Sequence, residues 1–213
     1  MTDTYVRHTV TAAPRQWQAV SDDVRLAGAA RIAVHGGSLF GVWRSQIGRP
    51  RDELTMITVW DSADPDFEAF LDGTSDIRVA THEVMNPTLR PTTSDAPHRQ
   101  GNYAFRSFET PEAHWDEFLD LCAGAWPGFE SSYDSQVIGL WRFKEDHDGL
   151  RRSLLLTRRP DLAMWERSKI PQGEAEAEVR RKLSRRYDLC ETTCVYTTTL
   201  LSADDEQDTV RWT

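Results

Sequence analysis

A spacing of 98 residues relates the two halves of this chain. Tryptophan recurs twice at that spacing, Trp17 with Trp115 and Trp43 with Trp141. The motif Gly-Val-Trp-Arg at 41–44 also recurs, as Gly-Leu-Trp-Arg at 139–142. Tryptophan is rare in proteins, so its repeated recurrence at one offset is not expected by chance. The chain therefore reads as two copies of one structural unit.

Each copy has the element pattern β-α-β-β-α-β, which is that of a ferredoxin-like unit. Runs of β-branched, aromatic and apolar residues predict four strands in each copy. In the first copy they cover 5–10, 38–45, 54–60 and 82–89; in the second they cover 103–108, 136–143, 152–158 and 190–201. The first repeat is predicted to span 1–95 and the second 99–202, and an acidic C-terminal tail covers 203–213.

Proline after a capping residue marks the expected helix starts. Thr110 before Pro111 predicts an N-cap for the first helix of the second copy, and Pro14 opens its counterpart. Asp64 before Pro65 predicts the second helix of the first copy, and the fourth helix is expected to begin near Asp161.

The strands carry apolar residues on both faces, so both faces of each sheet need a cover. Leu154, Leu155 and Leu156 do not alternate with polar residues. Helices cover one face of a four-stranded sheet and leave the other bare. The simplest arrangement packs the two sheets face to face with the helices outside. The predicted fold class is therefore α+β, two tandem ferredoxin-like repeats forming an intrachain α/β barrel.

Composition excludes several classes of function. The chain has 213 residues and a net charge of −9, which argues against a nucleic-acid binder. The basic run 180–186 has helical spacing and is interpreted as a solvated helix face. We find no membrane-spanning run and no signal peptide, and the three cysteines form no disulfide or zinc pattern. A cytoplasmic protein without a metal site, monomeric or homodimeric, is expected.

Residues 41–62 resemble the NIPSNAP family of the dimeric α/β-barrel superfamily. Gly41, Trp43, Gly48 and Trp60 match its pattern of a Gly-aromatic pair, a glycine-containing hairpin and an apolar strand that ends in tryptophan. The resemblance implies the barrel fold. The superfamily includes cofactor-free monooxygenases, haem enzymes, isomerases and proteins without known activity, so the fold alone does not choose among these.

Candidate site residues lie on the strands of the predicted barrel. His8 or Arg7 would polarise or deprotonate an apolar or aromatic small-molecule substrate, and Trp43, Thr58 and Trp60 would line the pocket. Arg106, which occupies the position of His8 in the second copy, is also a candidate for substrate binding. Any of these charged groups that is covered needs a partner. That partner is either a carboxylate, such as Glu83 or Glu191, or a bound ligand.

His82 supports an alternative function. It lies where the second helix meets the last strand of the first copy, and the resemblance implies a haem-ligating histidine near that helix in haem-binding members of the superfamily. The sequence thus leaves three hypotheses: a cofactor-free enzyme, a haem enzyme or carrier, and a ligand-binding or scaffold protein without catalytic activity. The first copy keeps more of the family pattern and is favoured as the active half.

Overall fold

The computed structural model describes residues 3–204 of the chain, which divide into two compact units. Within the described range, the first unit contains 3–87, 93–100 and 196–204, and the second contains 88–92 and 101–195. The expected division into repeats at 95 and 99 stays a prediction. Strands β4 and β8 each contribute residues to both units. None of the described helices is both long and apolar enough to cross a membrane.

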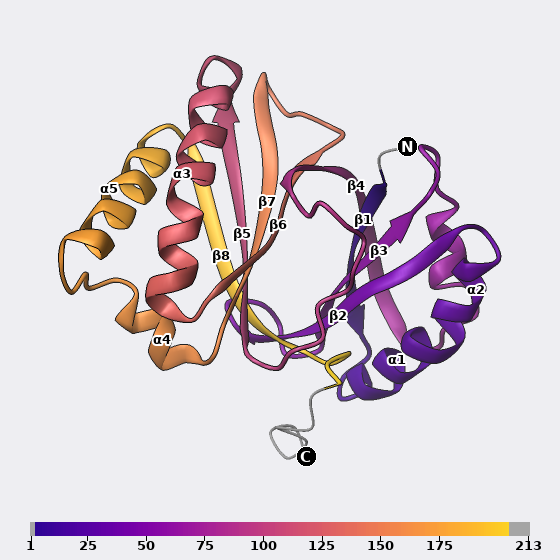
Figure 1. Ribbon diagram of the computed structural model, residues 1–213. Helices are drawn as coiled ribbons and strands as arrows, with labels where there is room; N and C mark the ends of the chain where they lie inside the picture. The colour runs from indigo at the N-terminus through magenta and orange to yellow at the C-terminus, as the bar shows by residue number, and fades with distance from the viewer. Residues whose placement is uncertain (1–2, 205–213) are drawn as a thin grey trace. The chain divides into compact units, whose positions relative to one another are not determined.

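The first unit contains the elements of one β-α-β-β-α-β repeat (Figure 1). In chain order they are β1 (Thr4–Ala12), α1 (Trp17–Asp23), a π-helical turn (Val24–Gly28), α2 (Ala29–Ala33), β2 (Gly37–Ile47), β3 (Glu53–Trp60), the 3-10 helix η2 (Phe67–Phe70) and β4 (Ile77–Arg90). The strand order is β4-β1-β3-β2-β8, and the end of β8 (Thr192–Leu200) pairs antiparallel with β2. The helix expected after Asp64 is only one 3-10 turn, η2.

The second unit repeats this order with longer helices. Its elements are β5 (Asn102–Pro111), the 3-10 turn Glu112–His114, α3 (Trp115–Tyr133), β6 (Gln136–Phe143), β7 (Leu150–Arg159), α4 (Leu162–Arg167), α5 (Glu174–Asp188) and β8. The strand order is β8-β5-β7-β6-β4. Figure 1 shows α3 and α5 side by side along the strands. The eight strands and the helices confirm the α+β class.

The N-cap predicted at Thr110 is wrong. Strand β5 continues through Thr110 to Pro111, and α3 begins only at Trp115, after a 3-10 turn. Thr110 is fully buried and its backbone pairs with Arg151 of β7. The ladder hydrogen bonds to β7 thus outweigh the local capping preference of the Thr-Pro pair.

The recurrent Gly-x-Trp motif has the same structural cause in both units. A β-carbon added to Gly41 would lie 2.4 Å from the Trp43 ring, and one added to Gly139 would lie 2.4 Å from the Trp141 ring. The pairing with the next strand shifts register at both positions, between Leu39 and Gly41 and between 137 and 139. Each glycine therefore leaves the space in which a fully buried indole lies against the bulged strand.

We expect Gly41→Ala and Gly139→Ala each to lower the free energy of unfolding by about 1–3 kcal/mol, because the new methyl group forces the indole out of place. Gly124→Ala in α3 is the matched control. Its β-carbon meets nothing closer than 3.5 Å, and removing a helical glycine should raise stability by about 0.5–1 kcal/mol. Urea denaturation of the three variants checks this. Equal stability of the wild type and Gly41→Ala would contradict the packing argument.

Candidate functional site

His8 lies on the helix-covered face of the first unit. Side chains alternate along β1, and the buried core of this unit takes Val6 and Val10 from the same face as His8. The imidazole is fully buried, and its ring centroid lies 4.9 Å from that of Phe70. A buried imidazole needs hydrogen-bond partners for both ring nitrogens.

Both nitrogens of His8 have such partners. Nδ1 lies 2.7 Å from Nδ1 of His82, which faces it directly across the β1–β4 pair. Nε2 lies 2.8 Å from Oγ1 of Thr58, and the indole Nε1–H of Trp60 donates to the same hydroxyl oxygen at 2.8 Å. Four of the residues predicted from sequence thus form one hydrogen-bonded chain: Trp60, Thr58, His8 and His82.

The hydrogen-bonded chain permits two arrangements of its protons. Either Thr58 donates to Nε2 of His8 and His8 donates to Nδ1 of His82, or His82 donates to His8 and His8 donates to Thr58. In both, a single proton lies between the two facing Nδ1 atoms. The first places the single N–H proton of neutral His82 on Nε2, and the second places that proton on Nδ1 and leaves Nε2 as an acceptor. The protonation of the outer nitrogen of His82 is therefore coupled to that of His8.

Burial keeps this pair neutral. Loss of solvation lowers the pKa of His8 well below its usual 6.5, and the neighbouring His82 lowers it further. Burial also lowers the pKa of His82, although the carboxylate of Glu68 acts in the opposite direction. The pair is neutral near pH 7, so His82 can accept a proton there.

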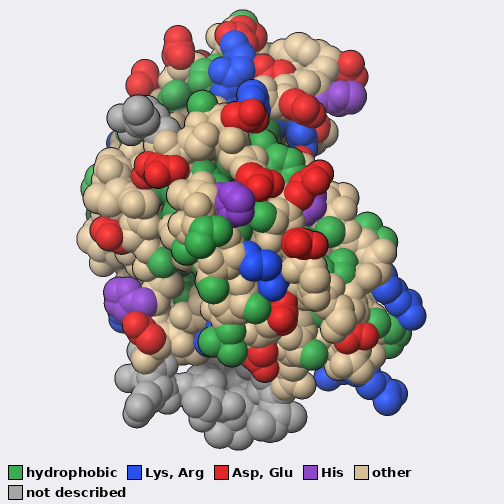
Figure 2. Space-filling model, turned by 90° about the vertical axis from the view of Figure 1, so that its right-hand side faces the viewer, with side chains coloured by type: hydrophobic (Ala, Val, Ile, Leu, Met, Phe, Trp, Pro, Cys, Tyr) green, Lys and Arg blue, Asp and Glu red, His purple; other side chains and the backbone are tan. Residues whose placement is uncertain are grey.

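The outer side of His82 lines an open groove. Its walls come from η2, the turn after it and the start of β4, and they combine apolar and acidic side chains: Asp66, Glu68, Ala69, Leu71, Asp72, Ile77 and Ala80. Figure 2 shows histidine side chains among Asp and Glu side chains on this face. The imidazole of His35, also in the groove, lies 3.6 Å from the carboxylate of Asp66. The groove is suited to an uncharged or cationic molecule rather than to an anion.

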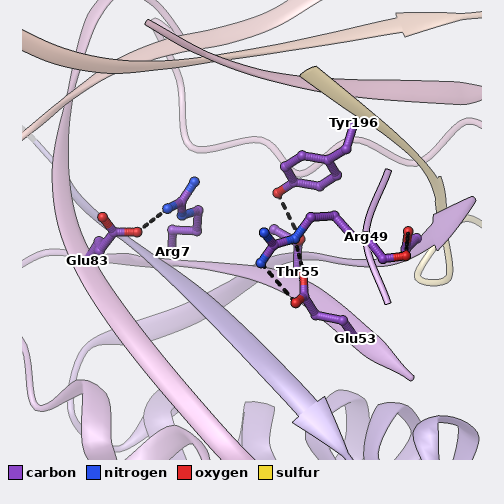
Figure 3. Close-up of polar contacts among 7 residues, drawn as sticks. Arg7, Arg49, Glu53, Thr55, Glu83 and Tyr196 are labelled. Atoms are coloured by element: carbon purple, nitrogen blue, oxygen red, sulfur yellow. Dashed lines mark hydrogen bonds and ion pairs between the residues drawn. The ribbon is translucent and has the colours of Figure 1, made fainter. Parts of the chain in front are cut away.

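Arg7 and Trp43 do not join this chain. They lie on the opposite face of the sheet from His8, where Arg7 forms an ion pair with Glu83 (Figure 3). On the same face the hydroxyl groups of Thr55 and Tyr196 lie 3.0 Å apart. The expectation that a covered charge takes a carboxylate such as Glu83 is confirmed for Arg7.

The same unit contains a second paired arginine near Tyr196. Both Nε and Nη2 of Arg49 donate to the carboxylate of Glu53, at 2.6 and 2.9 Å, and Figure 3 shows this pair beside the tyrosine. Burial raises the pKa of Tyr196, so its hydroxyl stays protonated at neutral pH. These paired groups account for their own charge and need no ligand.

Arg106 belongs to a separate cavity of about 310 Å³ within the second unit. The cavity lies between the β5–β7 sheet and helices α3, α4 and α5. Arg180 and Arg186 line it, and Arg186 is buried. Interpreting 180–186 as a solvated helix face was therefore wrong for Arg186, whereas Arg180 is exposed as expected. The spacing of the basic residues places cations on two faces of α5. This spacing could have indicated that one of the two faces is turned toward the protein interior.

Haem does not fit the groove beside His82. One nitrogen of the imidazole is taken by His8, and the groove offers three carboxylates and no Arg or Lys for the acidic haem propionates. The cavity of the second unit offers no His, Cys or Met, and of its tyrosines Tyr133 has a pKa raised by burial, which opposes phenolate ligation. Among residues 3–204 no cluster of three or more His, Cys, Asp or Glu could hold a metal ion.

Comparison with known proteins supports the fold. No protein-family model and no curated protein sequence matches the chain. A Lactobacillus acidophilus NCFM protein, provisionally described as a monooxygenase, superposes with a TM-score of 0.62 at 12% identity over 94% of both chains. An anthrone oxidase-like protein gives 0.64 at 14%, over 94% of this chain and 92% of its own. A chlorite dismutase variant from Candidatus Nitrospira defluvii, in complex with cyanide, gives 0.59 at 8%, over 93% and 90%.

These likenesses show the predicted dimeric α/β-barrel fold. Identities of this size show no activity, and the NIPSNAP resemblance stays a prediction.

The neutral histidine pair makes stability depend on pH. Because the pKa of His8 is lowered only in the folded state, the unfolded chain binds more protons below pH 6.5. Stability should therefore be complete above about pH 6.5 and fall below it, with a slope of about 1.4 kcal/mol per pH unit from His8 alone. We expect His8→Gln to reduce that slope in urea titrations between pH 5 and 7. The exposed His147→Gln should keep it, and an unchanged slope in His8→Gln would contradict the burial argument.

Proposed function

We propose that the protein is a small-molecule enzyme of the dimeric α/β-barrel type in which His82 exchanges a proton with an uncharged substrate. The observation that carries the proposal is the chain from Trp60 through Thr58 and His8 to His82. It fixes the orientation of a neutral imidazole whose Nε2 has no partner among the described residues. That imidazole lines a groove whose walls combine apolar and acidic side chains. These are the requirements for a positioned general base.

The reaction is proton abstraction next to a carbonyl group, or from an enol. Nε2 of His82 takes the proton, while the proton between the two imidazoles shifts toward His8, so that the pair shares the charge. Burial makes this charged state unfavourable, and Glu68 offsets the cost in part. The pair is therefore a short-lived acceptor that returns its proton. Return to a different atom of the substrate gives isomerisation. If the enolate carbon instead combines with molecular oxygen, the hydroperoxide that forms loses water to leave a new carbonyl group, so that one oxygen atom enters the substrate and the other leaves as water.

Thr58 and His8 act as positioning residues in this proposal. The Trp60 indole can only donate, so it holds the Thr58 oxygen in place, and the hydroxyl then orients the His8 ring through Nε2, either as donor or as acceptor. Arg7 and Trp43 contribute to the opposite face of the sheet, so the proposal gives them no catalytic role.

The direct test is deuterium incorporation into 2-tetralone, an uncharged enolisable ketone, in D₂O. We expect wild type to accelerate exchange at the carbon next to the carbonyl and His82→Ala to lose about 10²–10⁴-fold of that acceleration. His147→Ala, at an exposed site of the second unit, should keep it. Oxygen uptake in the same sample separates monooxygenation from isomerisation. A His82→Ala variant with wild-type exchange would overturn the proposal.

Thr58→Val tests the positioning role, because it keeps the side-chain shape and removes the hydroxyl. We expect exchange to slow by about tenfold, and ¹⁵N NMR of the histidines to show a changed tautomer ratio at His8. The unpaired Trp60 and His8 nitrogens should lower the free energy of unfolding by about 1–3 kcal/mol. If the NMR signals change and the exchange rate does not, His82 acts without the rest of the chain.

A further inference from the structure

The cavity of the second unit has an unusual charge for a protein of net charge −9. Five cations line it, and the only carboxylate among its lining residues is that of Asp188. The cations come from three parts of the unit: β5 and β7, the turn after α4, and α5. They are Arg106, Arg159, Lys169, Arg180 and Arg186. A concave site with one sign of charge concentrates ions of the opposite sign.

The buried arginines of this cavity contact only neutral acceptors. Nη1 of Arg159 donates to the Thr157 hydroxyl at 3.2 Å, and Nη1 of Arg186 lies 3.6 Å from the Cys122 sulfur. Nε of both arginines is buried without a partner among the described residues. Arg106 reaches only the Thr193 hydroxyl, at 3.5 Å. Guanidinium groups that are buried without carboxylates leave donors for a ligand to satisfy.

Other arginines of the same helix behave differently. Arg181 of α5 pairs with Glu174 and Glu178, and Arg185 pairs with Glu117 of α3. These two point to solvent, and their charge is balanced. Carboxylates therefore pair with the outer arginines of α5. Among the residues that line the cavity, the only carboxylate is that of Asp188.

Mutual repulsion adds to the cost of burying these cations. Burial and the neighbouring Arg186 lower the pKa of Arg106 to about 10, and burial and Arg106 lower that of Arg159 to about 10. The pKa of Lys169 is also lowered, first by burial and then by the surrounding arginines. A bound anion would remove most of this repulsion.

Aromatic rings form the rest of the wall and hold the cations in place. The guanidinium carbon of Arg159 lies 5.0 Å from the Phe129 ring centroid and 4.5 Å from that of Trp165. Nζ of Lys169 lies 5.0 Å from the same Trp165 ring. Trp126 and Tyr133 complete the apolar lining. Cation–π contacts of this kind orient the charged groups and leave their hydrogen-bond donors free.

We infer that this cavity binds a small aromatic anion, with its carboxylate or phosphate against Arg106, Arg159 and Arg186 and its ring among the aromatic side chains. The planar donor fork of arginine suits both head groups. A volume of about 310 Å³ lies at the lower end of the range for small-molecule sites, so the ligand is compact. The site is independent of the groove beside His82, which is acidic.

Binding is measured by calorimetry with four probes: 1-naphthoate, 1-naphthyl phosphate, 1-naphthalenemethanol and inorganic phosphate. We expect 1-naphthoate or 1-naphthyl phosphate to bind with one site per chain, and the tighter of the two identifies the head group. The uncharged alcohol and inorganic phosphate should bind at least tenfold more weakly. Equal affinity for the alcohol, or binding of inorganic phosphate alone, would overturn the inference.

Variants decide whether the binding site is this cavity. Arg106→Met and Lys169→Met should each weaken 1-naphthoate binding by tenfold or more, and Arg181→Met is the matched control on the outer face of α5. The melting temperature supplies a second measurement. Arg106→Met should melt at or above the wild-type temperature without ligand, because repulsion is relieved, and should lose the increase that 1-naphthoate produces in wild type. A variant that melts lower but still gains from the ligand would contradict the assignment.

Discussion

The position that His8 and Arg106 share in their two strands determines much of the chemistry of this protein. Both side chains point to the helix-covered face of their sheet, where His8 is fully buried and Arg106 is partly buried beside aromatic and cationic side chains. A polar group at that position must be satisfied by protein groups or by a ligand. The two units differ in the partners that they offer to this polar group.

In the first unit the polar group at this position is a neutral imidazole. The imidazole of His8 needs one donor and one acceptor, and Thr58 and His82 supply them from the adjacent strands β3 and β4. The histidine pair buries no charge, and the hydrogen-bonded chain ends at His82, which is partly exposed. In the second unit the group is an arginine, which stays charged even when its pKa is lowered. Thr157 and Thr193 cannot neutralise this charge, so the second unit is incomplete without an anion, whereas the first is complete without a ligand.

The sequence predicted the strands well because each strand is marked by its own run of β-branched, aromatic and apolar residues, and because the same motif recurs in both units. The strand 136–143 agrees with the structure at both ends, and the Gly-x-Trp repeat has one packing cause in both units. Helix ends were predicted less well. The Thr110–Pro111 signal was overridden by pairing with β7, and the helix expected after Asp64 shrank to a single 3-10 turn.

Strand pairing brings several of the predicted site residues together, whereas the wall of the second cavity comes from helices distant in sequence. His8, Thr58, Trp60 and His82 lie on one face of paired strands, although the sequence placed His82 in a separate haem hypothesis. The cavity around Arg106 required knowing that α5 packs on α3 and turns Arg186 inward while Arg185 faces out. Helical spacing alone does not decide which of two basic faces is buried, because both faces of α5 carry arginine.

The difference between His8 and Arg106 also explains how two units with the same element order can favour different ligands. An acidic groove beside a neutral base favours uncharged molecules, and a cationic aromatic cavity favours anions. An anion suited to the second cavity is therefore repelled by the groove, and an uncharged molecule lacks the charge that the cavity attracts. The two units share the Gly-x-Trp packing within their sheets and differ at the helix-covered position. Selection on that position can change the ligand without changing the fold.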